Sequence, residues 1–285
     1  MNKAFIHYSY AKVNLGLKIL NKRPDNYHNI HSLFIEINLS DELTFFANEN
    51  HKLSIKGPTH TQFPLDENNL ITKAYKLMRN HLNFNELEYA IQIKKNIPIG
   101  SGLGGGSSNA ATTLKALNEL WDLNFSNKKL EKLGLSLGAD VPFFIKGGFQ
   151  LAEGLGEKLS PQKIDFLLDL YILLIIPPIH ISTATAYAKL NKYLHTNQDH
   201  SKFPPVSKPV NWQLFENDFE NMIGKTYPEI RKLKRALYDS GAIYSGLSGS
   251  GSAVFGFFDD EADAKSAELL FSASNKTMLT RTLLR

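Results

Sequence analysis

The feature that most constrains this chain is a run of small residues between Ile97 and Ala110. Five glycines and three serines fall between Gly100 and Ser108, after an alternating segment and before one rich in alanine and leucine. Glycines let a backbone turn sharply and leave its N–H groups open to a ligand. A helix that begins directly afterwards adds free N–H groups and the positive end of its dipole, and both favour an anion. The run therefore predicts a phosphate-binding loop.

Comparison with three known phosphate-binding patterns does not identify the ligand that carries the phosphate. Residues 100–105 match G-x-G-x-x-G, but the preceding segment alternates instead of being continuously apolar. Glu119 and Asp122 lie on or just past the following helix, not at the end of a second parallel strand. The Walker pattern fails because Phe219 stands where the first glycine before residues 224–226 belongs. The His-Arg-Asp and Asp-Phe-Gly sequences of protein kinases do not occur.

Composition narrows the class of protein. The chain has 285 residues, of which 42% are hydrophobic and 21% charged, as in an ordinary globular protein of one large or two average domains. Its net charge of +4 is mild and no long basic run occurs, so we expect no nucleic-acid partner. The absence of cysteine excludes disulfides, a thiol nucleophile and a cysteine zinc site, and it suits a reducing compartment.

The same sequence gives no sign of a membrane partner. The N-terminal residues lack the apolar core and cleavage pattern of a signal peptide. The most apolar run, residues 166–179, is broken by Asp169 and ends in two prolines, so it predicts a buried strand and not a membrane span. We therefore expect a cytoplasmic protein.

Hydrophobic periodicity predicts a mixture of strands and helices. Residues 12–19 alternate, which predicts a half-buried strand with Lys12 and Asn14 side by side on its polar face. The proline-containing residues 195–210 predict a mobile surface loop. Other strands are expected at residues 32–39, 43–47, 52–56, 87–94, 143–146, 168–176, 242–245, 253–258 and 277–283. Helices are expected at residues 69–80, 108–121, 126–137, 183–194, 212–223, 228–240 and 261–270.

Asp140 stands out because the predicted local structure does not explain why an aspartate is at this position. It follows a predicted helix that ends at Gly138, and a carboxylate is disfavoured at a helix C-terminus. An aspartate in that place is often no more than a turn former. Taken alone, Lys12 is more typical of plain surface, and Tyr27 and His28 of an exposed polar connection.

Three segments of the chain resemble, in order and spacing, the motifs of the GHMP kinase superfamily. They are Ala-Lys-Val-Asn-Leu at residues 11–15, the glycine loop at residues 98–108, and Gly-Leu-Ser-Gly-Ser-Gly at residues 246–251. Arg-Pro-Asp-Asn-Tyr-His at residues 23–28 and Leu-Gly-Ala-Asp-Val-Pro-Phe-Phe at residues 137–144 further resemble the members that phosphorylate a cytidine diphosphate-linked alcohol of the non-mevalonate isoprenoid pathway. So does the triple glycine that runs into Ser-Ser-Asn-Ala-Ala at the start of the next helix.

The resemblance implies a fold and a pair of cofactors. The fold would be the α+β, two-domain GHMP kinase fold. Residues 1–158 would form a ribosomal-protein-S5-like α/β nucleotide-binding domain, and residues 159–285 a ferredoxin-like α+β substrate domain. The cofactors would be ATP and Mg²⁺, and the small-molecule substrate would be a cytidine diphosphate compound.

Roles for individual residues follow from the same resemblance. Asp140 would be the catalytic base and Lys12 its partner, keeping the carboxylate ionised and attracting the developing alkoxide. The ATP phosphates would be held by the backbone of Pro98, Ile99, Gly100, Ser101, Gly102, Leu103, Gly104, Gly105, Gly106, Ser107 and Ser108.

The substrate would be recognised through its base. Tyr27 and Tyr187 would sandwich the cytosine, His28 would hydrogen-bond its edge, and Asn14 and Thr183 would lie near the substrate. The chain departs from the family pattern twice. Asn26 replaces a common glycine, which is tolerable because asparagine visits positive φ. Tyr187 replaces a phenylalanine found in some relatives, and either ring stacks on a base.

Two alternatives stay open at this point. One is a GHMP kinase for another small alcohol of the homoserine or mevalonate type, which would have no use for an aromatic base pocket. The other is a catalytically silent relative that senses the ligand. The presence of both Lys12 and Asp140 argues against silence.

Overall fold

The structure is a computed structural model that describes residues 4–48, 55–57, 63–82, 88–190, 202–203 and 205–283. The chain forms two compact units, each assembled from three separate stretches. Unit 1 comprises Met1–Ala11, Leu39–Ile99 and Gly104–Gly147, and unit 2 comprises Lys12–Asn38, Gly100–Leu103 and Gly148–Arg285. No helix among the described residues is long and apolar enough to cross a membrane.

Two long paired strands, β1 (Ala4–Lys22) and β2 (His28–Asn48), contribute residues to both units. Asn26, in the turn that joins them, has a φ of 67°, as expected of an asparagine that replaces glycine. Two strands were predicted where β2 runs unbroken, because Ser40-Asp41 reads as a polar connection. That prediction is wrong: the Asp41 side chain is fully buried and bonded, so no turn is needed to bring it to water.

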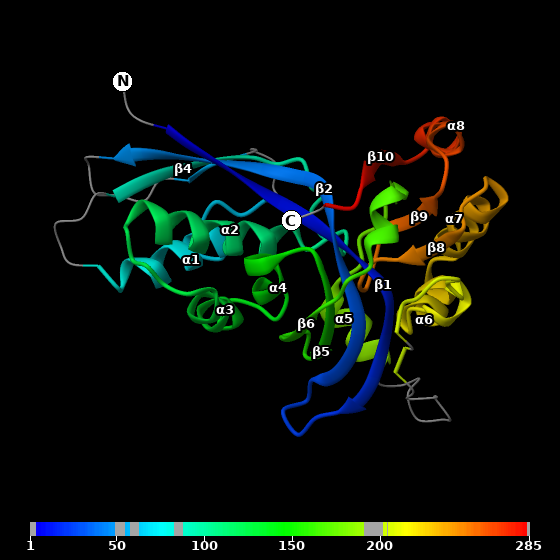
Figure 1. Ribbon diagram of the computed structural model, residues 1–285, viewed down its shortest axis with the longest axis horizontal. Coiled ribbons are helices and arrows are strands. Elements are labelled where there is room, and N and C mark those ends of the chain that lie inside the picture. Colours follow the sequence, from blue (N-terminus) through cyan, green and yellow to red (C-terminus); the bar gives the residue numbers. More distant parts are fainter. Residues whose placement is uncertain are drawn as a thin grey trace. The chain divides into compact units, whose positions relative to one another are not determined.

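In the part of unit 1 that the structure describes, a small sheet is combined with helices α1 to α4 (Figure 1). The sheet order is β3-β4-β2, with β3 parallel to β4 and β4 antiparallel to the C-terminal half of β2. Helix α2 contacts α1, α3 and α4. Asn69 and Ser126 cap α1 and α3 through their side chains. The elements are β3 (Ile55–Lys56), β4 (Glu88–Lys94), α1 (Leu70–Arg79), α2 (Gly105–Leu120), α3 (Asn127–Leu135) and α4 (Val141–Lys146).

Helix α4 replaces the strand predicted for residues 143–146. Its first five residues are all buried, so the apolar run carries no periodicity that would separate a strand from a buried helix. Pro142 lies in the first turn, where its missing N–H costs nothing. Asp140 is the N-cap residue of this helix, so the dipole next to it favours its charge. The mismatch expected from the preceding helix is therefore wrong.

Unit 2 contains two antiparallel arrangements of strands (Figure 1). The N-terminal half of β2 pairs with β5, which pairs with β6. A separate four-stranded sheet has the order β10-β7-β9-β8, and α7 and α8 pack against it. The strands are β5 (Phe149–Gly154), β6 (Lys158–Pro161), β7 (Tyr171–Ile176), β8 (Tyr244–Leu247), β9 (Val254–Phe258) and β10 (Lys276–Arg281). The helices are η1 (Asp165–Asp169), α5 (Thr183–Leu190), η2 (Trp212–Leu214), α6 (Phe219–Thr226), α7 (Pro228–Asp239) and α8 (Glu261–Ser272).

The single helix predicted for residues 212–223 is two elements, η2 and α6. Between them the backbone pairs with Leu17 of β1: the Leu17 N–H donates to Glu216 O (2.9 Å), and the Asp218 N–H donates to Leu17 O (2.8 Å). These strand-like bonds replace the helical ones that the local sequence favours. Most of the predicted loop at residues 195–210 lies outside the described residues, as does the end of the helix predicted to reach residue 194.

Candidate active site

The glycine loop exposes its backbone and hides its side chains. Gly100, Gly102 and Gly104 have φ angles of +66°, +82° and +72°, a region that other residues rarely adopt. Ser101 and Leu103 between them are 3% and 1% exposed. Helix α2 begins at Gly105, not at residue 108 as predicted, and no side chain caps it. The first N–H groups of α2 and the turned backbone before it form the kind of surface that binds phosphate.

Within unit 2 the middle of the loop is fixed by three hydrogen bonds. The Lys12 N–H donates to Leu103 O (3.0 Å), and the Ala253 N–H donates to Ser101 O (2.9 Å). Ser248 Oγ donates to Gly102 O (2.9 Å). The approach at Gly102 is close, since a Cβ there would lie 2.1 Å from Ser248 O. The segment at residues 246–251 thus contacts the glycine loop directly. Ser248, which makes this contact, was not among the predicted site residues.

Lys12 and Asn14 are buried, at 3% and 1% exposure, so the half-buried strand expected here is covered on both faces. The Lys12 ammonium donates to Asn14 Oδ1 and lies 4.7 Å from the centre of the Phe34 ring. Asn14 Nδ2 donates to Ser32 Oγ (3.0 Å), which donates to Gly16 O (2.6 Å). A buried charge needs such partners, because burial without them is costly. The chain of bonds fixes where the ammonium points.

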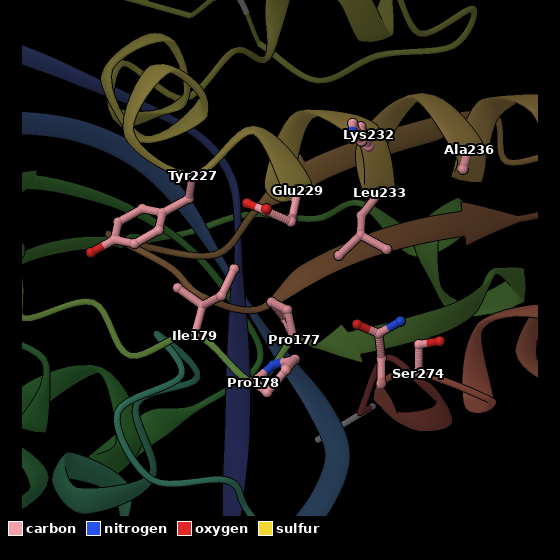
Figure 2. A pocket seen from close by; sticks show the side chains of 10 residues that line it. Pro177, Pro178, Ile179, Tyr227, Glu229, Lys232, Leu233, Ala236 and Ser274 are labelled. Atoms are coloured by element: carbon pink, nitrogen blue, oxygen red, sulfur yellow. The ribbon is translucent and has the colours of Figure 1, made fainter.

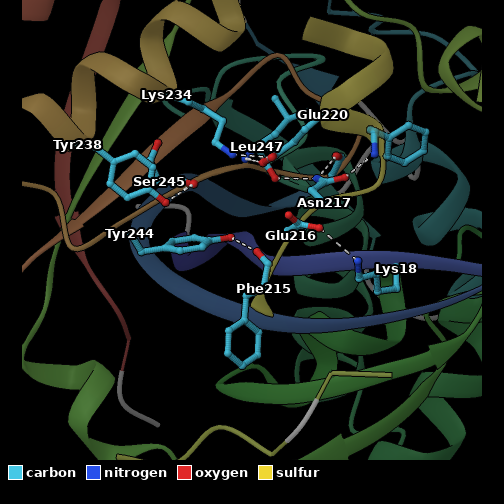
Figure 3. A network of polar contacts seen from close by, with 12 residues as sticks. Lys18, Phe215, Glu216, Asn217, Glu220, Lys234, Tyr238, Tyr244, Ser245 and Leu247 are labelled. Carbon is cyan, nitrogen blue, oxygen red and sulfur yellow. Dashed lines mark hydrogen bonds and ion pairs between the residues drawn. The ribbon is translucent and has the colours of Figure 1, made fainter. Parts of the chain in front are cut away.

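A polar network at the start of α6 supports residues 246–251 (Figure 3). Asn217 Nδ2 donates to both Leu247 O and Gly249 O, each at 2.8 Å. Glu220 accepts from the Leu247 N–H (3.0 Å) and from Lys234 Nζ. Asn217 was not predicted as a site residue, because it falls inside a segment predicted to be helix. An asparagine just before a shorter helix would have been the signal.

Two of the residues predicted to recognise the base, His28 and Tyr187, contact each other in unit 2. The rings of His28 and Tyr187 stack with centroids 5.8 Å apart and planes 22° apart. Tyr187 also meets the edge of Phe219 at 4.9 Å. Tyr27, in the turn before His28, is 64% exposed, so its ring is accessible. Thr183 Oγ1 is hydrogen-bonded to Ser250 Oγ (2.9 Å), which links α5 to residues 246–251.

Asp140 belongs to unit 1 and is half-buried at the start of α4. Its segment lies near the first turn of α2, because a Cβ at Gly138 would be 4.0 Å from Ser107 Oγ. Ser108 is 1% exposed and its hydroxyl accepts from Ser9 Oγ (2.8 Å), so the part of Ser108 suited to a ligand is its backbone. Unit 1 therefore places the segment that carries Asp140 near the first turn of α2.

A different hollow in unit 2, of about 650 Å³, is lined by none of the predicted site residues (Figure 2). Pro177, Pro178 and Ile179 form one side of it, and residues of α7 such as Glu229 and Leu233 form another. Its walls are mainly apolar, as in many ligand pockets. Size and apolar character alone would thus have drawn attention away from the glycine loop.

Family models match both halves of the chain. The model of the GHMP kinases N terminal domain matches residues 69–148, and the model of the GHMP kinases C terminal domain matches residues 190–273. The 4-diphosphocytidyl-2-C-methyl-D-erythritol kinase of Prosthecochloris aestuarii is 39% identical over 282 residues, which cover 95% of each chain. That of Thermodesulfovibrio yellowstonii is 40% identical over 276 residues, which cover 92% of this chain and 93% of the relative.

Solved structures give the same result. A crystal structure of 4-(cytidine 5'-diphospho)-2C-methyl-D-erythritol kinase matches with a TM-score of 0.80 and 27% identity, covering 99% of this chain and 100% of that one. A homoserine kinase from Cytophaga hutchinsonii matches with a TM-score of 0.72 over 99% of this chain and 96% of that one, but at 18% identity it shares the fold alone. Because relatives that are 39–40% identical match it along nearly its whole length, the chain belongs to the GHMP kinase family and has its two-domain α+β fold.

Proposed function

We propose that this chain transfers a phosphoryl group from ATP to the 2-hydroxyl of 4-(cytidine 5'-diphospho)-2-C-methyl-D-erythritol. As a GHMP kinase it is a phosphotransferase that uses ATP. The choice of alcohol rests on its relatives, which are 4-diphosphocytidyl-2-C-methyl-D-erythritol kinases at 38–40% identity. The observation in the chain itself that carries the choice is the stacked His28–Tyr187 pair, since a small aliphatic alcohol needs no aromatic base pocket.

The glycine loop is suited to the triphosphate. Phosphoryl transfer needs alignment and charge neutralisation more than covalent help from the protein. The turned backbone of residues 98–108 and the uncapped start of α2 would hold the phosphates through N–H groups. Mg²⁺, bound mainly through phosphate oxygens, would screen the remaining charge.

Asp140 and Lys12 would carry the proton and the charge on the alcohol. The Asp140 carboxylate, at the start of α4, would accept the proton of the 2-hydroxyl. The Lys12 ammonium, oriented by Asn14, would stabilise the alkoxide that develops. Because the lysine is buried, its charge is little screened by water.

The remaining predicted residues would recognise the cytidine end. Tyr27 and Tyr187 would sandwich the base, His28 would bond its edge, and Asn14 and Thr183 would lie near the alcohol. On the strength of the sequence we further propose an ATP-binding part at residues 1–158 and a substrate part at residues 159–285, a division that differs from the two compact units of the structure. We also propose a cytoplasmic location and no nucleic-acid or membrane partner.

One assay separates this proposal from its alternatives. Purified protein with ATP and Mg²⁺ is given the cytidine substrate, homoserine or mevalonate in parallel, and ADP release is followed through a coupling enzyme. We expect turnover with the cytidine compound alone. Turnover with homoserine or mevalonate would make the chain a kinase for another alcohol, and no turnover with any of them would favour the ligand-sensing relative.

A further inference from the structure

A buried polar cluster in unit 1 joins the two ends of the glycine loop. Its members are Ser9 of β1, Asp41 of β2, Lys95 just after β4, and Ser108 and Asn109 of α2. Ser9 and Asp41 are fully buried, and Asn109 is 2% exposed. None of the roles proposed above uses Ser9, Asp41, Lys95 or Asn109.

The Asp41 carboxylate reaches both ends of the loop, one with each oxygen. Oδ1 accepts the backbone N–H groups of Asn96 and Ile97, both at 2.8 Å, where the chain enters the loop. Oδ2 accepts from Asn109 Nδ2 (2.8 Å), where the chain leaves the loop in α2, and from the Lys95 ammonium. A single side chain thus spans the base of the segment.

Asn109 is the other half of this link. Its amide nitrogen has two hydrogens, and they go to Asp41 Oδ2 and to Ser9 Oγ, each at 2.8 Å. Ser9 Oγ in turn donates to Ser108 Oγ (2.8 Å) in the same turn of α2. Lys95 adds a further contact, since a Cβ at Gly105 would lie 2.9 Å from its Nζ.

A buried polar cluster stabilises a fold less readily than apolar side chains of the same volume do. Burying a carboxylate and an amide costs free energy that hydrogen bonds must offset, whereas apolar residues of the same shape would pack without that demand. What a satisfied polar network provides in exchange is one fixed geometry. Here the geometry that it fixes is the distance between the entry of the glycine loop and the first turns of α2.

We propose that Asp41 and Asn109 are positioning residues that set this distance and thereby the affinity of the loop for the ATP triphosphate. Neither touches the nucleotide; both act through the backbone of residues 96–109. The effect on ATP binding requires only that the chain uses ATP. The comparison with the alcohol rests on the proposed function, which names that alcohol.

The test is the response of each substrate to Asn109→Ala. Losing the amide cuts the link from Asp41 to α2 while the bonds to Asn96 and Ile97 stay, so we expect the KM for ATP to rise about tenfold. The KM for the cytidine substrate should change less than about twofold, because the substitution disturbs the site of the ATP phosphates and not that of the alcohol. Steady-state kinetics at saturating co-substrate measure both constants.

A double-mutant cycle tests that the two residues act as one link. Asp41→Asn is also expected to raise the KM for ATP, and the double variant should be no worse than the more affected single one, because residues in one network are not additive. Fully additive effects would overturn the link. Ser9→Ala removes a peripheral member and should raise the KM for ATP about threefold with the fold intact, which keeps the proposal testable if Asp41→Asn does not fold.

Glu88→Gln is the matched control for lost stability. Glu88 is a second buried carboxylate of unit 1, and it pairs with Tyr75 and Arg79 at the other end of β4. We expect Glu88→Gln to lower the melting temperature while the KM for ATP stays as in the wild type. If Glu88→Gln raises that KM as much as Asn109→Ala does, the effect is general destabilisation and the proposal fails.

Binding measured without the alcohol separates this inference from the proposed function. Calorimetric titration with a non-hydrolysable ATP analogue and Mg²⁺ should show the same tenfold loss for Asn109→Ala. An unchanged affinity in folded Asn109→Ala protein would overturn the positioning role. A wild-type protein that binds the analogue but ignores the cytidine compound would overturn the proposed function instead.

Discussion

A proton must leave the alcohol during phosphoryl transfer, and Asp140 is the residue proposed to receive it. Asp140→Asn keeps the shape of the side chain but removes the acceptor. We expect kcat to fall on the order of 10²-fold or more, with the KM for the cytidine substrate largely kept. Single-turnover and steady-state kinetics measure both, and a kcat near that of the wild type would remove Asp140 from the mechanism.

Tyr27 tests the base pocket with little risk to the fold, since 64% of its surface is exposed. Tyr27→Ala should weaken binding of the cytidine substrate by roughly 1–3 kcal/mol, the usual scale for stacking of a base on an aromatic ring. Tyr27→Phe keeps the ring and should bind as the wild type does. A loss confined to ATP would contradict the assignment of the pocket.

The sequence predicted the backbone conformation of a residue better than it predicted what surrounds its side chain. The positive φ of Asn26 follows from what asparagine tolerates, and the structure confirms it. The burial of Lys12 does not follow from alternation, because a period of two says which side chains share a face but not what covers that face. The burial of Asp41 does not follow from its sequence either, because a polar pair such as Ser40-Asp41 is more typical of an exposed connection.

At the scale of elements, the glycine loop depends on backbone conformations that most side chains disfavour. Gly104 has a φ of +72°, and a β-branched residue there is strained and also blocks the approach of a phosphate. Gly104→Val should therefore raise the KM for ATP.

Gly241, at the end of α7, supplies the control for that substitution. Its φ is +93°, so Gly241→Val introduces comparable strain at a position with no proposed role in binding. We expect it to lower the melting temperature without changing the KM for ATP. A Gly104→Val variant with an unchanged KM would count against the loop as the phosphate site.

Elements with a clear period or a clear cap were predicted well, and those set by distant partners were not. Helices α1 and α3 have caps and an apolar stripe that the sequence shows directly. Helix α4 is apolar all round, and the break between η2 and α6 is made by bonds to Leu17, some two hundred residues earlier in the chain. No local pattern contains that information.

For the whole molecule, two histidines, the half-buried His7 and the buried His31, predict how stability depends on pH. Burial lowers the pKa of His7, beside Glu119 and Lys115, and of His31, beside Glu153 and Lys202. Their pKa in the folded state thus lies below the unfolded value of about 6.5, so the unfolded chain binds more protons as the pH falls. The contribution of the two histidines to the free energy of unfolding should therefore be complete above about pH 6.5 and should decrease as the pH falls below that value.

Denaturant unfolding at a series of pH values checks this expectation. His31→Gln should flatten the dependence between about pH 6.5 and 5, because a neutral amide replaces the group that takes up the proton. His7→Gln should do the same from unit 1. If neither variant changes the slope, the two histidines are not its source.

The assembly of each unit from three stretches has a consequence for inheritance. With six stretches alternating along the chain, the polypeptide passes from one unit to the other five times. A single genetic crossover between two such kinases would cut through a unit instead of exchanging it. New substrate preferences in this lineage are therefore expected to arise by point changes and loop insertions more readily than by shuffling of gene segments.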